Sequence, residues 1–187
     1  MDEITEVIAF WHDEVGRERW YNATPELDAQ IRARYQGLWE HARTGACDDW
    51  AQSAVGALAL CILFDQMPRN MFRGEKLAFA TDAQARKVAD AAIERGFDME
   101  IVDPLRQFFY VPFMHSENLS DQERGVRLAA ERMPDEQLRH AKAHRAVIAR
   151  FGRFPWRNEV VGRYSSDEEA AFLWQGGYER MLAQVAR

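Results

Sequence analysis

The sequence predicts an all-α protein, a single domain over residues 1–187 in which eight or nine helices form antiparallel hairpins. Three observations predict this fold class. Apolar residues repeat at helical spacing along most of the chain, no segment shows the alternation of a half-buried strand, and glycines stand where the helical patterns end. The length of 187 residues and a hydrophobic content of 47% suit one domain with one core.

Two helices are predicted within the first 45 residues. Apolar residues at helical spacing predict a first helix from about Glu3 to Glu14. Thr24 and Pro25 have the pattern of an N-cap followed by proline at the first helical position, and Gly45 marks the end of the same helix. One apolar stripe runs between them, as in a helix that packs on one face.

The next helix is expected to be central and covered on all sides. Asp48 or Ser53 can open it, and its body at 54–64 is apolar on nearly every face. Pro68 lacks a backbone donor and disfavours helical geometry at Met67. We therefore expect this helix to end near DQMPRN, residues 65–70.

The remaining helices are predicted from their start and stop signals. Each begins at a capping residue or a proline and ends near a glycine or a proline. Two of the starts, at Ser120 and Ser166, carry the S-x-x-E pattern of a capping box. The predicted spans are Thr81–Gly96, Asp103–Pro112, Ser120–Arg132, Pro134–Gly152 and a last helix that opens at Ser166.

Composition and charge exclude several classes of function. A net charge of -6 argues against nucleic acid as a partner. The longest uncharged apolar run, Ala54–Phe64, is shorter than the roughly 20 residues that span a bilayer, and the acidic N-terminus lacks the basic region of a signal peptide. We expect a cytoplasmic protein with no membrane partner, and a homo-oligomer is compatible with the sequence. Two cysteines are too few for a disulfide scaffold.

The charge is unevenly placed along the chain. Seven lysines or arginines stand between Arg139 and Arg163 against the single acid Glu159, whereas the first 30 residues carry eight acids and two arginines. The two segments can neutralise each other within the fold. Alternatively, the basic segment stays available for an anion.

Four long motifs carry a resemblance to a known family. They are DQMPRNMFRG at 65–74, AFATDAQA at 78–85, FFYVPFMHSENLSDQE at 108–123 and HRAVIARFGRFPWRNEVVGR at 144–163. They closely resemble the bacterial family known as domain of unknown function nine-twenty-four. The resemblance implies an all-helical fold similar to a tetratricopeptide-repeat superhelix and no particular reaction. The family often has histidine where this chain has Trp156.

The most unusual part of these motifs is RFGRFPWRN at 150–158. Its aromatic rings can bury themselves in a compact turn after a helix and thereby fix the aim of Arg153 and Arg157. Arginine binds a carboxylate or a phosphate through two parallel hydrogen bonds. Either acids of the same chain, such as Asp65, Glu117 or Asp121, accept these bonds, or a bound anion does.

Candidate catalytic residues are His115, Glu117 and His144. His115 and Glu117 are expected in the loop before Ser120, where a histidine and a carboxylate serve as a general base with its orienting partner or as a structural pair. His140 and His144 have a spacing that can chelate a metal, but no HExxH pattern or nearby cysteine supports it. We predict no metal and no cofactor.

Two functional hypotheses follow. The first is a pocket that binds a small anionic or polar ligand, with the question of catalysis left open. The second is a helical-repeat scaffold for a protein or peptide, in which the arginine and acid motifs are purely structural. The residues predicted to bind the ligand are Asp65, Arg69, Asn70, Arg145, Arg153, Arg157, Asn158 and Arg163.

Overall fold

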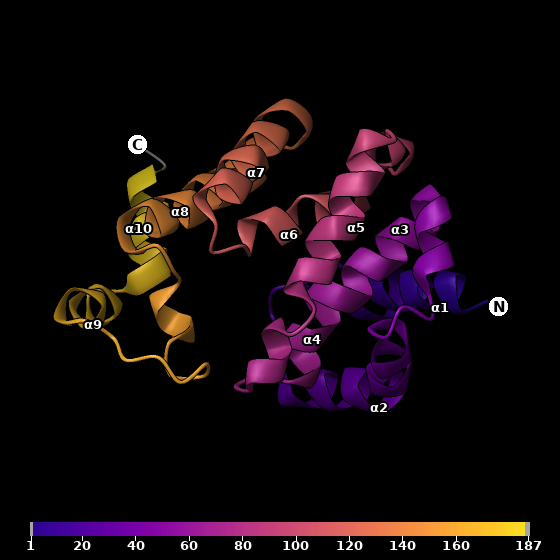
Figure 1. The fold of residues 1–187 in the computed structure, drawn as a ribbon, viewed down its shortest axis with the longest axis horizontal. Helices are drawn as coiled ribbons and strands as arrows, with labels where there is room; N and C mark the ends of the chain where they lie inside the picture. Colours follow the sequence, from indigo (N-terminus) through magenta and orange to yellow (C-terminus); the bar gives the residue numbers. More distant parts are fainter. Residues whose placement is uncertain (1, 186–187) are drawn as a thin grey trace. The chain divides into compact units, whose positions relative to one another are not determined.

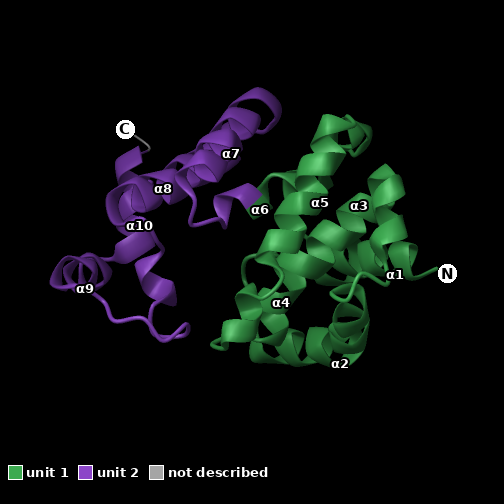
Figure 2. Cartoon of the chain, viewed as in Figure 1, with its two compact units in different colours: residues 1–112 green, residues 113–187 purple. Residues whose placement is uncertain are grey.

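The computed structural model describes residues 2–185, and within this range the chain is helical with no strand (Figure 1). The predicted all-α class is confirmed. The chain divides into two compact units, Met1–Pro112 and Phe113–Arg187 (Figure 2). The single domain and the tetratricopeptide-repeat-like superhelix stay predictions, and each unit is described by itself.

The first unit holds five α-helices linked by short 3₁₀ and π segments. The α-helices are α1 (Glu3–Ala9), α2 (Pro25–Ala42), α3 (Ala54–Cys61), α4 (Met67–Met71) and α5 (Asp82–Glu94). The 3₁₀ segments are Asp48–Gln52, Lys76–Phe79, Phe97–Glu100 and Leu105–Phe109, and the π segments are Phe10–Val15 and Ile62–Gln66. Helix α3 packs against both α1 and α5 and is buried along nearly its whole length, as the apolar pattern predicts.

The helical path continues through Pro68 and ends at Met71, directly after the DQMPRN stretch near which the sequence predicts its end. Ile62–Gln66 forms a π turn, and the Met67 N–H donates to the carbonyl of Ile62, five residues back. The extra residue of the π turn places Pro68 in the first turn of α4, where a backbone N–H has no partner within the helix. The first predicted helix also contains a π segment, because α1 ends at Ala9 and the chain continues as the π-helix Phe10–Val15.

The caps of the first unit follow the sequence signals with one exception. The side chains of Thr24 and Ser53 cap α2 and α3 as predicted. Thr81 precedes α5 but does not cap it. Its buried hydroxyl instead accepts a hydrogen bond from Trp39 Nε1 (3.1 Å) and donates one to the carbonyl of Phe64 (2.7 Å). Thr81 therefore links three segments of the core.

The second unit is built on a hairpin of two long helices. These are α7 (Leu119–Arg132) and α8 (Asp135–Phe151), which pack closely along each other. A 3₁₀ turn (Pro155–Arg157), α9 (Asp167–Trp174) and α10 (Gly177–Val185) follow, and α10 packs against α8. Val147, Phe154, Phe172 and Met181 are among the buried residues of its core.

Two predicted helix boundaries near the start of this unit were wrong. Helix α7 begins at Leu119 rather than Ser120, because the Asn118 side chain is the N-cap and accepts from the Ser120 N–H (2.9 Å). Pro112 does not stop a helix but lies inside the short helix α6 (Val111–Met114), after the 3₁₀ segment Leu105–Phe109. The predicted capping box of Ser166 and Glu169 and the glycine end of α8 are both confirmed.

Two helical glycines test the packing of the first unit. A Cβ on Gly56 in α3 would lie 2.1 Å from the carbonyl oxygen of Trp50, whereas a Cβ on Gly37 in α2 would meet nothing within 4 Å. We expect Gly56→Ala to lower the free energy of unfolding by about 1–3 kcal/mol through overpacking. The matched change Gly37→Ala is expected to raise it by about 0.5–1 kcal/mol, because alanine favours a helix over glycine. Urea unfolding followed by circular dichroism measures both, and equal effects of the two changes would contradict this packing of α3.

Candidate functional site

The RFGRFPWRN segment forms the compact aromatic turn expected from its sequence. Gly152 ends α8 in the left-handed region (φ 68°). Phe154 is fully buried, and its ring stacks on that of Trp156 with the centroids 4.8 Å apart. The guanidinium of Arg157, itself buried, lies 4.6 Å from the centroid of the Phe154 ring. The turn is therefore held by ring contacts before any ion pair is considered.

Arg153 is paired with Glu169 of α9. Its Nε and Nη2 donate to the two carboxylate oxygens of Glu169 at 2.6 and 2.7 Å, and Nη2 also donates to the carbonyl of Tyr164 at 3.0 Å. Glu169 accepts a further bond from the Ser166 N–H (2.8 Å) in the capping box. Mainly because of the Arg153 hydrogen bonds, the pKa of Glu169 falls to about 2. Arg153 thus fixes the start of α9 to the turn.

Glu117 makes a second clamp of the same kind. Arg163 donates to both of its carboxylate oxygens, at 2.7 and 2.9 Å, and the Phe154 N–H donates to one of them at 2.9 Å. Burial acts to raise the pKa of Glu117, but the hydrogen bonds from Arg163 and Phe154 outweigh it and hold the pKa below its ordinary value. Glu117 therefore joins the turn before α7 to the loop after α8.

His115 and Glu117, which the sequence offers as a pair, contact different parts of the second unit. Both residues lie in the turn before α7, as expected, but the carboxylate bonds of Glu117 go to Arg163 and Phe154. The His115 ring instead lies against that of His144, with the centroids 6.1 Å apart. The geometry gives Glu117 a structural part rather than that of an orienting carboxylate.

His144 is enclosed by aromatic rings. Its Nδ1 lies 2.8 Å from the carbonyl of His140 and 3.3 Å from the hydroxyl of Tyr178. A carbonyl only accepts, so this Nδ1 carries the proton. Burial, followed by the nearby His115, lowers the pKa of His144 to about 3. A base whose pKa lies so far below neutrality is a poor acceptor for catalytic protons.

His140 completes a short polar chain on the same side of α8. Its Nδ1 lies 2.6 Å from the Tyr178 hydroxyl, and the two rings are stacked. Within residues 2–185 no group of three or more histidine, cysteine, aspartate or glutamate side chains is placed to hold a metal ion. His140 and His144 are thus tied to Tyr178 and the backbone.

The candidate residues of the first unit are also held by acids. Arg69 forms ion pairs with Asp65 (3.3 Å) and Asp82 (3.0 Å). Asn70 donates to Asp28 (2.8 Å), which also pairs with Arg73 (2.6 Å). Arg69 is partly buried between its two carboxylates.

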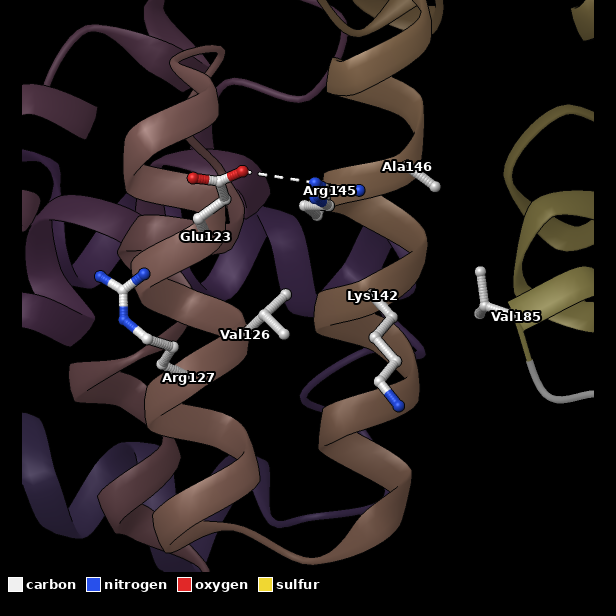
Figure 3. A pocket seen from close by; sticks show the side chains of 7 residues that line it. All are labelled: Glu123, Val126, Arg127, Lys142, Arg145, Ala146 and Val185. Carbon is white, nitrogen blue, oxygen red and sulfur yellow. Dashed lines mark hydrogen bonds and ion pairs between the residues drawn. The ribbon is translucent and has the colours of Figure 1, made fainter.

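Arg145 is placed differently from the other predicted arginines, because it lines an open groove of the second unit. The groove has a volume of about 510 Å³ and lies on α7, α8 and α10 (Figure 3). Consecutive helical residues point about 100° apart, so Arg145 leaves α8 on a different side from His144. The lining residues are Glu123, Val126, Arg127, Lys142, Arg145, Ala146 and Val185.

The groove is basic, and few of its charged side chains form ion pairs. Arg145 and Glu123 form an ion pair of 3.3 Å in which each side chain is 45% exposed. Such an exposed pair stabilises a protein by about 0–1 kcal/mol. Among the described residues, Arg127 and Lys142 take part in no ion pair. The groove thus offers three cationic side chains against one carboxylate.

Sequence reasoning identified only Arg145 among these lining residues. Lys142 was counted in the basic segment but not placed in a site, and Arg127 and the apolar residues were missed. The available signal was the three-residue spacing of Lys142 and Arg145 on one face of a predicted helix. The position of Arg127 beside them depends on how α7 and α8 pair, which the spacing does not specify.

These features define an all-helical protein whose second unit carries clamped arginines and an open basic groove. The chain belongs to the family described as "Bacterial protein of unknown function (DUF924)", whose sequence profile matches residues 7–177. The resemblance found in the sequence is thereby confirmed. Within residues 2–185 no helix has both the length and the apolar character that crossing a membrane requires.

A solved structure is similar over nearly the whole chain. It is the structure of the protein of unknown function ATU0120 from Agrobacterium tumefaciens, with 37% sequence identity and a TM-score of 0.86. The similarity covers 91% of this chain and 96% of that chain. None of the curated proteins matches the chain.

The two neighbouring glutamates of α9 allow a direct test of the Arg153 clamp. Glu169 is 3% exposed and bonded at both oxygens, whereas Glu168 is 63% exposed and pairs with Arg150 at the surface. We expect Glu169→Gln to lower the free energy of unfolding by about 2–3 kcal/mol, because it leaves a charged donor without its acceptor. Glu168→Gln should change it by less than about 1 kcal/mol. Denaturant unfolding followed by tryptophan fluorescence compares the two, and a similar small loss in both would overturn the clamp.

The enclosed His144 predicts a loss of stability in mild acid. Its pKa is about 3 in the folded protein against an ordinary 6.5, so between these values the unfolded chain binds the extra proton. The contribution of the neutral His144 to the free energy of unfolding is complete above pH 6.5 and falls as the pH drops toward 3. We expect a fall of about 1–2 kcal/mol between pH 6.5 and 5, which His144→Asn removes.

The control for this pH effect is His41→Asn, since His41 is exposed on α2. That variant should keep the wild-type dependence of the unfolding free energy on pH. An unchanged pH dependence in the His144 variant would show that the imidazole is not enclosed as described.

Proposed function

We propose that this protein binds a small anionic ligand in the groove lined by Arg127, Lys142 and Arg145. The observation that carries the proposal is an open groove of about 510 Å³ with three cationic side chains and a single carboxylate. Small-molecule sites have volumes of about 300–1,000 Å³. The groove has a suitable size and a charge opposite to that of the ligand.

The charge of the groove contrasts with that of the whole chain. The protein has a net charge of -6, whereas the groove lining has two more positive than negative groups. Concentrating cations on one surface of an acidic protein raises the local concentration of anions there. This contrast supports small anions over nucleic acid, for which an acidic protein offers a poor extended surface.

The arginine-rich turn has a supporting part in this proposal. Arg153 and Arg163 donate to the carboxylates of Glu169 and Glu117. The Asn158 side chain donates to the Ser165 hydroxyl (3.1 Å), and the Asn158 backbone carbonyl accepts from the Arg163 N–H (2.7 Å). We assign these residues to holding the end of α8 rather than to the ligand. Because the pKa of His144 is about 3, the proposal is one of binding and includes no proton transfer.

One observation favours the alternative function, a scaffold for a protein partner. Tyr164 and Trp174 of the second unit are 97% and 92% exposed. Aromatic side chains are enriched at protein interfaces. Trp174 is not among the groove residues, so Trp174→Ala separates the two functions: it should weaken partner binding and leave anion binding unchanged.

The binding proposal predicts stabilisation by anions that depends on the groove cations. We expect inorganic phosphate to raise the melting temperature of the wild type, because a ligand that binds only the folded state stabilises it. Arg145→Gln and Lys142→Gln should each weaken phosphate binding by about 10-fold or more, the usual effect of losing a charge-assisted hydrogen bond. A thermal-shift titration measures the effect.

The matched control for these variants is Arg150→Gln. Arg150 stands on the same helix but pairs with Glu168, outside the groove. This variant should retain wild-type phosphate binding. Equal losses in the Arg145 and Arg150 variants would indicate a general charge effect and contradict a site in the groove.

A further inference from the structure

The lining of the groove also indicates which kind of anion it suits. Three partly buried apolar residues also line the groove, Val126 of α7, Ala146 of α8 and Val185 of α10. An inorganic ion would leave this apolar surface in water. A ligand that carries an apolar group beside its charge covers it and gains from the burial.

The number of cations favours a doubly charged head group. Arg127 of α7 and Arg145 of α8 each carry a planar fork of donors, and Lys142 adds an ammonium; all three line the groove (Figure 3). A phosphate monoester carries about -1.5 to -2 charges near pH 7, with three acceptor oxygens. A monocarboxylate carries one charge and two oxygens. The phosphate matches the excess of two positive groups in the lining.

Glu123 is the anionic partner of Arg145 in the groove. It reaches from α7 to Arg145 of α8, as Figure 3 shows, in an exposed pair of 3.3 Å. A pair this exposed is weak and is readily exchanged for a doubly charged ligand. Once the ligand is present, the Glu123 carboxylate repels it. Glu123 therefore acts as an internal competitor for Arg145.

We infer that the groove binds organic phosphate monoesters with a small apolar group, and that Glu123 lowers their affinity by competing for Arg145. This inference rests on the proposed anion-binding function.

Isothermal titration calorimetry of the full chain with three probes tests the ligand class. The probes are n-butyl phosphate, inorganic phosphate and butyrate. We expect n-butyl phosphate to bind about 10-fold more tightly than either of the others, because only it uses both the cations and the apolar residues. Val126→Ser should reduce the ratio of the affinity for n-butyl phosphate to that for inorganic phosphate.

The part of Glu123 is tested by Glu123→Gln, which keeps the side-chain shape and removes the charge. We expect this variant to bind n-butyl phosphate about 3- to 10-fold more tightly, as the loss of one nearby like charge implies. Glu131→Gln is the control, since Glu131 is exposed on the same helix and is not a groove residue. It should bind like the wild type.

The outcomes separate the two levels of the proposal. Binding of none of the three probes would overturn the anion-binding function itself. Equal affinities for n-butyl phosphate and inorganic phosphate, or for n-butyl phosphate and butyrate, would overturn the ligand class and leave anion binding in place. Weaker or unchanged binding by the Glu123 variant, with its circular dichroism spectrum unchanged, would overturn the competition for Arg145.

Discussion

Two glutamates hold the second unit together, and each does so through one arginine fork and one backbone N–H. Glu117 accepts from Arg163 and from the Phe154 N–H, and Glu169 accepts from Arg153 and from the Ser166 N–H. Three such hydrogen bonds stabilise the ionised carboxylate where it is shielded from water, whereas an unpaired charge there would be costly. The chain before α7, the loop after α8 and the start of α9 are joined by these two side chains. The ring contacts around Phe154 hold the turn itself, and the two glutamates tie this turn to the neighbouring segments.

The basic segment of the sequence is thereby divided between two tasks. Its C-terminal arginines, 150, 153 and 163, pair with glutamates 168, 169 and 117. Its N-terminal part, on α8, exposes Lys142 and Arg145 in the groove. Clamping the end of α8 fixes the helix that carries these two cations. The structural and the binding alternatives are therefore compatible, since each applies to a different part of the segment.

The sequence predicted those parts of the fold that depend on neighbouring residues. The starts of α2 and α9 follow from the caps Thr24 and Ser166, and the end of α8 follows from Gly152, because each signal is local to its helix. The π turn before Pro68 was missed, because its hydrogen bond to a carbonyl five residues back has no residue pattern of its own. The partners of Arg153 and Arg163 were left open for a related reason. Each arginine pairs with an acid of another segment, and only packing decides which acid that is. The groove residue Arg127 was missed for the same reason, because its position depends on how α7 packs against α8.

The most direct test of the clamp is a double-mutant cycle on Glu117 and Arg163. The free energy of unfolding would be measured for the wild type, Glu117→Gln, Arg163→Met and the double variant. Because both side chains are only partly exposed and share two hydrogen bonds, we predict a coupling energy of about 1–2 kcal/mol. A coupling below about 0.5 kcal/mol is typical of independent sites and would show that the two residues do not hold the loop together.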